Sequence, residues 1–139
     1  MFRSITGRAR AVALTVAALV SVPLLTGTAS AAPVDLYAPY ARAAAKVASD
    51  GTLLAAKNVA SVTKPAGTTG QYCVKVSDPD IDDLKDAAIQ ATSNSTWATL
   101  IVFGQPTSTC GNAANTITVW SADRNSTTWT NSSFTVTVQ

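Results

Sequence analysis

Histidine and glutamate are both absent from this chain of 139 residues, and cysteine occurs only twice. The lack of histidine excludes the Ser-His-Asp and Cys-His catalytic sets and removes the most common zinc ligand. No glycine-rich phosphate-binding loop is present either. An enzyme built on this sequence would have to work with aspartate, serine, threonine, tyrosine or lysine alone. We therefore expect no catalytic residue, no cofactor and a function other than catalysis.

No apolar run of the length of a transmembrane helix is present. The longest run, residues 11–25, is shorter than the ~20 residues that span a bilayer, and it contains Pro23. Three arginines precede this run, and the small residues Ala29, Ser30 and Ala31 follow it. A charged start, an apolar centre and a small-residue end are the three parts of a secretory signal. We predict a signal peptide over residues 1–31, and a secreted or cell-envelope-associated protein.

The remaining 108 residues, 32–139, have the length of one domain. They keep seven of the ten basic residues and all eight acidic ones, so the net charge changes from +2 to −1. Binding to nucleic acid or to an anionic membrane needs a basic stripe or patch. Neither remains after cleavage. We expect no nucleic-acid partner, no membrane span in the mature chain, and a protein or glycan partner outside the cell.

Both cysteines, Cys73 and Cys110, lie in the exported part. An even number of cysteines in an oxidising compartment predicts a disulfide, and two free thiols are the alternative. The bridge would close a loop of about 38 residues and would stabilise the domain by roughly 4 kcal/mol.

Short segments with alternating polarity predict an all-β fold. Residues 71–76 place Tyr72, Val74 and Val76 on one face and Cys73 on the other. Many such strands separated by glycine, proline and asparagine turns indicate a single antiparallel β-sandwich or barrel. The further predicted strands are 59–63, 87–92, 97–103, 116–121 and 133–138.

Three segments carry more specific expectations. Residues 40–57 predict a hairpin that turns at Asp50-Gly51, with a short helix over 40–48 as the alternative. Residues 97–103 are apolar on both faces, which is typical of a central, covered strand. Residues 125–133 are polar and predict a long hairpin loop.

An acidic run is the strongest candidate for a metal site. Asp78, Asp80 and Asp82 alternate as in the opening of a calcium-binding loop. The match is incomplete, because the sixth and twelfth positions hold Asp83 and Ile89 instead of glycine and glutamate. The alternative is a solvated turn in which aspartate caps a short helical piece, residues 82–87.

Two tryptophans are the candidate ligand-binding residues. Trp120 falls on the polar face of its predicted strand, and Trp129 stands among threonines and asparagine. A tryptophan beside hydroxyl and amide groups can stack on a sugar or another flat ligand. The alternative is that both rings cover an edge of the core.

Six short stretches of the mature chain form a pattern: residues 50–53, 57–65, 70–74, 110–112, 117–119 and 134–136. In these stretches the chain resembles small, largely uncharacterised secreted proteins of actinobacteria. This resemblance implies a secreted β-domain and transfers no catalytic residue. Our leading hypothesis is a non-enzymatic binding module, and the alternative is a secreted inhibitor of an exported protease or other hydrolase.

Overall fold

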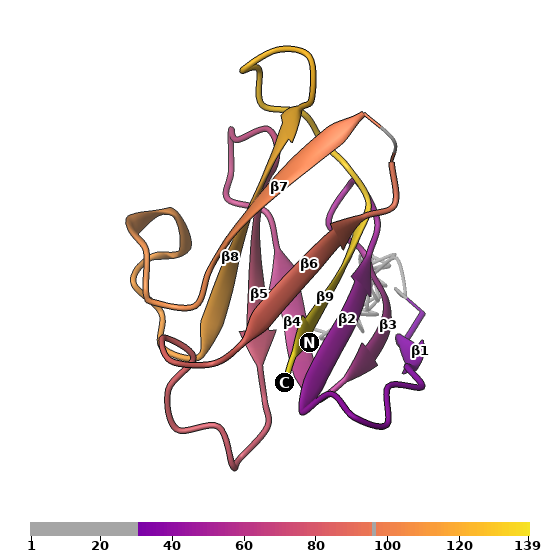
Figure 1. The fold of residues 1–139 in the computed structure, drawn as a ribbon, viewed down its shortest axis with the longest axis vertical. Coiled ribbons are helices and arrows are strands. Elements are labelled where there is room, and N and C mark those ends of the chain that lie inside the picture. The colour runs from indigo at the N-terminus through magenta and orange to yellow at the C-terminus, as the bar shows by residue number, and fades with distance from the viewer. Residues whose placement is uncertain (1–30, 96) are drawn as a thin grey trace, which may run out of the picture. The chain divides into compact units, whose positions relative to one another are not determined.

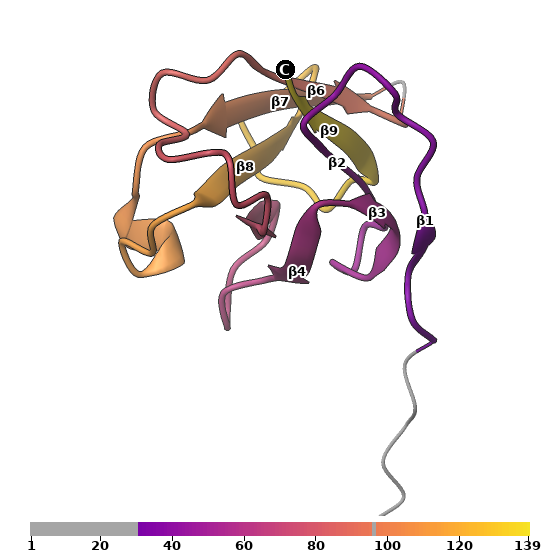
Figure 2. The ribbon, with the colours of Figure 1, turned by 90° about the horizontal axis from the view of Figure 1, so that it is seen from below.

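Two β-sheets packed face to face make up the part of the chain that the computed structural model describes, residues 31–95 and 97–139 (Figure 1, Figure 2). The predicted signal peptide lies, apart from Ala31, outside the described residues. The first sheet has the strand order β1-β3-β2-β9-β6, and the second has the order β4-β5-β8-β7. The strands are β1 Val34–Asp35, β2 Ala43–Val47, β3 Leu53–Lys57, β4 Val59–Thr63, β5 Gln71–Val76, β6 Ile89–Ser93, β7 Ala98–Phe103, β8 Thr116–Asp123 and β9 Phe134–Val138.

The core lies between the two sheets. Tyr72 of β5 and Phe134 of β9 are fully buried and meet edge to face, with ring centroids 5.0 Å apart. Buried residues alternate with less buried ones along β9, and Lys75 is exposed between the buried Val74 and Val76 of β5, as the sequence pattern predicts. All strand pairs are antiparallel except β1 with β3. The predicted all-β sandwich is confirmed.

The first hairpin forms where Asp50-Gly51 predicts it. Strands β2 and β3 pair on either side of this turn. The Asp50 carboxylate accepts a hydrogen bond from the Thr52 amide at 2.8 Å, and Gly51 has a φ of 92° that suits a residue without a side chain. The hairpin is confirmed, and the alternative of a short helix is wrong.

The disulfide between Cys73 and Cys110 is confirmed, with 5.7 Å between the Cα atoms. Cys73 points away from the core, on the outer face of the second sheet, as its alternation predicts. Cys110 ends a short 3₁₀ helix, η1 Ser108–Cys110. The bridge therefore fastens the loop between β7 and β8 across the back of β5.

Strand β7 is not the central, covered strand that its sequence predicts. It is the last strand of the second sheet. Leu100 and Val102 pack against the core, whereas Ile101 on the opposite face is 45% exposed. A run that is apolar on both faces shows that both faces avoid charge, but it does not show that both are covered.

Two connections also differ from prediction. Residues 125–133 do not form one long hairpin loop from β8 to β9, because these strands belong to different sheets, but a short turn does bring Trp129 back antiparallel to Ala122. Residues 82–87 form a turn instead of a helical piece, in which the Asp83 carboxylate accepts the Lys85 amide at 2.9 Å. Leu84 in this turn is buried against the core. Within the described residues, no helix is long and apolar enough to cross a membrane.

Candidate binding face

The outer face of the second sheet carries the tryptophans. None of the three tryptophans of the chain belongs to the buried core, whose large aromatic residues are Tyr72 and Phe134. Trp120 is outward on β8, because it pairs with Gln71 on one side and Ile101 on the other. Burying a tryptophan contributes more than burying most side chains, so three such residues outside the core call for another explanation.

Trp120 stands between two other aromatic rings. Its ring centroid lies 4.9 Å from that of Phe103 and 5.4 Å from that of Trp129, and both contacts are edge to face. The indole N–H of Trp120 is buried and has no hydrogen-bond partner among the described residues. The three rings thus form a diagonal row across the outer face.

Trp129 is held in this row by its backbone. It bridges to Ala122, and on either side of it the Asp123 amide donates to the Thr128 carbonyl and the Thr130 amide to the Ser121 carbonyl, at 2.9 and 3.0 Å. Residues 128–130 therefore extend the sheet beside the end of β8, after the loop at the top of Figure 1.

Gly70 makes room for this segment. A Cβ atom at Gly70 would lie 2.7 Å from the Thr130 carbonyl oxygen, which is too close for any side chain. The Gly70 amide also donates to the Asn131 side-chain oxygen at 2.8 Å, and Lys64 Nζ donates to the same oxygen at 2.7 Å. Trp129, which is 39% exposed, is consequently presented on an anchored backbone.

Trp97 extends the aromatic surface along β7. The Arg124 amide donates to the Trp97 carbonyl at 2.7 Å, which continues the β7–β8 ladder by one residue. From the side-chain alternation along β7 we infer that Trp97 shares the outward side of Ile101, and its side chain is 64% exposed. We call the side chains of Trp97, Ile101, Phe103, Trp120 and Trp129 the tryptophan face.

A groove of about 440 Å³ lies on the same outer face, beside the disulfide. Ser61 and Thr63 of strand β4 form one side of the groove, and the loop around η1 forms the other side. Cys73, Lys75 and Thr116 line its floor. We call this the disulfide groove.

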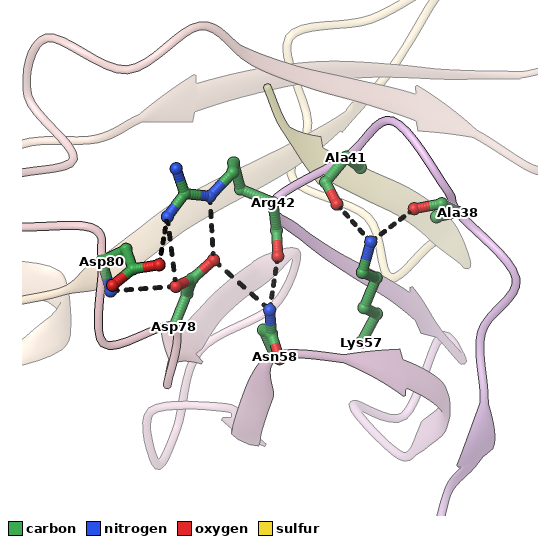
Figure 3. Close-up of polar contacts among 7 residues, drawn as sticks. All are labelled: Ala38, Ala41, Arg42, Lys57, Asn58, Asp78 and Asp80. Carbon is green, nitrogen blue, oxygen red and sulfur yellow. Dashed lines mark hydrogen bonds and ion pairs between the residues drawn. The ribbon is translucent and has the colours of Figure 1, made fainter.

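The predicted calcium ligands are placed differently. Asp78 is buried, and its carboxylate is bound by Arg42, with Nε to Oδ2 at 3.2 Å and Nη2 to Oδ1 at 3.4 Å (Figure 3). Asn58 and the Asp80 backbone amide donate to the same carboxylate at 3.3 and 3.0 Å. The Asp80 carboxylate lies 3.3 Å from Arg42 Nη2, and Asp82 is exposed.

This network uses the oxygens that a metal ion would need. Hydrogen bonds from Arg42 lower the pKa of Asp78, helped by the Asp80 amide and opposed by burial. The same pair raises the pKa of Arg42. No cluster of three or more metal-ligating side chains occurs among residues 31–95 and 97–139. The geometry favours a structural ion pair over a calcium site at Asp78, Asp80 and Asp82.

Lys57 completes this polar region. Its ammonium donates to the carbonyl oxygens of Ala38 and Ala41 at 2.8 and 2.7 Å, and Asn58 donates to the Arg42 carbonyl at 2.7 Å (Figure 3). These contacts tie the segment before β2 to the junction of β3 and β4. The region has a structural role that its residues alone did not predict, because Arg42 and Asp78 are 36 positions apart.

No protein-family model, curated protein or solved structure matches this chain. Trp120 and Trp129, which the sequence suggests as ligand-binding residues, lie in contact in the structure. Trp97, Ile101 and Phe103 were missed, although the apolar outward positions of residues 97–103 were the available signal.

Proposed function

We propose that this protein is a secreted, non-enzymatic binding module that recognises a partner outside the cell, or in the cell envelope, through the tryptophan face. One observation carries the proposal: Trp120 and Trp129 contact each other on the outer face of the second sheet, and none of the three tryptophans belongs to the core. Contiguous exposed apolar patches mark interaction sites, and tryptophan and arginine dominate binding hot spots. Arg124 is exposed beside Trp97 and supplies the cation at the rim.

The composition supports binding without catalysis. The chain has no histidine and no glutamate, and the carboxylate of Asp78, whose pKa is lowered, is bound by Arg42. The disulfide fits an oxidising compartment outside the cytoplasm.

The proposal is tested with material from cells that secrete the protein. Purified protein is mixed with their envelope fraction and culture fluid, and its bound fraction is measured by sedimentation and surface plasmon resonance. Trp97→Ala and Trp129→Ala should each weaken binding at least about tenfold, as expected of hot-spot residues. Tyr37→Ala is the matched control, because Tyr37 is 91% exposed on the opposite sheet's flank, before β2. An equal effect of all three substitutions, or no binding by the wild type, would reject the proposal.

The loop between β7 and β8 favours a second candidate, an inhibitor of an exported protease or other hydrolase. Besides the disulfide, a hydrogen bond of 2.6 Å between the hydroxyls of Thr107 and Thr118 pins this loop, and the Asn112 amide donates to the Thr107 carbonyl at 2.8 Å. A rigid, exposed loop loses little entropy on binding. A panel of exported hydrolases assayed with micromolar protein tests this candidate, which is rejected if no member is inhibited.

A further inference from the structure

The tryptophan face and the disulfide groove both lie on the outer face of the second sheet, and β5 runs from one to the other. The outward residues of β5 are Lys75 and Cys73, which line the groove, followed by Gln71. Gln71 is half-buried and pairs directly with Trp120. At ~3.3 Å per strand residue, Lys75 and Gln71 are about 13 Å apart along β5. A ligand that contacts both parts must therefore be a chain longer than a single sugar or amino acid.

The chemistry of the two parts fits a sugar polymer. Aromatic rings stack on the apolar faces of sugar rings, and Trp129 offers an exposed ring on an anchored backbone. The groove lining contributes hydroxyl groups from both sides and the floor, which can hydrogen-bond a sugar, although the Thr116 hydroxyl already donates to the Ala114 carbonyl. These hydroxyls belong to Ser61, Thr63, Thr109 and Thr116.

The charge distribution selects among sugar polymers. Lys75 is the one charged residue of the groove lining. Its ammonium donates one hydrogen bond to the Ala114 carbonyl at 2.7 Å, which leaves two N–H groups for a ligand. Among the described residues, the ion pairs are confined to Arg42 and Lys85, which face the acidic segment 78–86. Neither Lys75 nor Arg124 has a carboxylate partner there, so the outer face complements a negatively charged ligand.

We infer that the binding module takes an acidic polysaccharide, a chain of sugars bearing carboxylate or phosphate groups. The chain stacks on Trp129 and Trp120, passes Gln71 and continues into the disulfide groove, where Lys75 pairs with an acidic substituent. This inference rests on the proposed function and adds the class of ligand to it.

The wild-type protein is tested by affinity electrophoresis through gels that contain one polysaccharide each. Alginate supplies carboxylates, a phosphorylated mannan supplies phosphates, and hydroxyethyl cellulose is neutral. Retardation should be strong in at least one acidic gel and weaker in the neutral gel. Stronger retardation in the alginate gel or in the mannan gel identifies carboxylate or phosphate as the recognised group.

Two substitutions separate stacking from charge. Trp129→Ala should weaken retention at least about tenfold in every gel that retains the wild type, because it removes the stacking ring. Lys75→Gln should weaken retention about threefold in the acidic gel only, and this difference should vanish at 1 M salt, where the Debye length is ~3 Å. The matched controls are Tyr37→Ala and Lys46→Gln, since Lys46 is exposed on β2 of the other sheet. Circular dichroism confirms that each variant is folded.

The outcomes separate this inference from the proposed function. Absence of retention in all three gels, or equal retention of wild type and Trp129→Ala, overturns the inference. If the tryptophan substitutions still abolish binding to the envelope fraction or culture fluid, the binding module stands with a protein partner. If no substitution on the tryptophan face alters any binding, both the proposed function and the inferred ligand class are rejected.

Discussion

Two nitrogens of the Arg42 guanidinium donate hydrogen bonds to the Asp78 carboxylate, at 3.2 and 3.4 Å, although the two residues are 36 positions apart in the chain. The pair joins the start of β2 to the end of β5 and so connects the two sheets. Because the guanidinium favours the ionised carboxyl, the pKa of Asp78 is lower in the folded chain than in the unfolded one.

The first prediction concerns acid stability. A lowered carboxyl pKa contributes stability above the unfolded value of ~3.9, and this contribution is lost as the pH falls through the folded pKa. Asp78→Asn should therefore lower the thermal midpoint at pH 7, and its difference from the wild type should shrink between pH 5 and pH 2. Thermal unfolding followed by circular dichroism measures this. Asp82→Asn, at an exposed position, is the control, and a difference that does not change with pH contradicts the prediction.

The second prediction concerns the hydroxyl of Tyr72. It donates to the Ser49 carbonyl at 2.8 Å and accepts from the buried Ser132 amide at 3.1 Å. Tyr72→Phe leaves that amide without a partner, which should reduce the free energy of unfolding by about 1–3 kcal/mol. Urea denaturation gives the value. Tyr37→Phe, at a side chain that is 91% exposed, should change it by less than about 0.5 kcal/mol; equal effects would exclude the assigned role.

The third prediction concerns the disulfide. Its removal in the Cys73→Ser, Cys110→Ser double variant releases a loop whose ends are 37 positions apart, at a cost of roughly 4 kcal/mol in unfolding free energy. Reductant should destabilise the wild type by a similar amount and leave the double variant unchanged. A wild type that is insensitive to reductant in urea would contradict this.

The fourth prediction compares two glycines. Gly70 has a φ of 68° and backbone atoms of Thr130 close to where a Cβ would lie, whereas Gly67 has a φ of 74° and open space around it. Gly70→Ala combines backbone strain with a clash and should lower the unfolding free energy by more than about 2 kcal/mol. Gly67→Ala carries the strain alone, ~1 kcal/mol. Similar losses in urea denaturation would show that Gly70 is not needed for close approach.

The fifth prediction concerns calcium. A site with a Kd of ~0.1 mM would add about 1.4 kcal/mol of stability at 1 mM calcium. Because Arg42 and Asn58 already bind the Asp78 carboxylate, we expect the same thermal midpoint with 1 mM calcium and with a chelator. A calcium-dependent rise that Asp82→Asn removes would establish the site.

Local patterns were sufficient for most of the fold. The alternation of Tyr72, Val74 and Val76 predicts a strand with one buried face, and the structure has that strand and that face. The Asp50-Gly51 turn predicts the first hairpin because few residue pairs suit its backbone. These features depend on residues that are close together in the chain, so they can be predicted from the sequence.

Features that depend on distant residues were not predictable in this way. The run at residues 97–103 is equally compatible with a covered strand and with an outermost one, and the strand order of the sheet makes it outermost. The spacing of Asp78, Asp80 and Asp82 resembles that of metal ligands, and the sequence does not show that Arg42 lies beside Asp78 in the fold.

The sequence alone determined that the chain is all-β, that Cys73 points away from the core and that no histidine-based chemistry is present. Only the tertiary structure decided that Trp120 and Trp129 meet on one outer face and that the disulfide groove lies on the same face. The physical reason is that side-chain alternation is a property of each strand, whereas a surface is made by strands whose pairing depends on the packing of the whole domain.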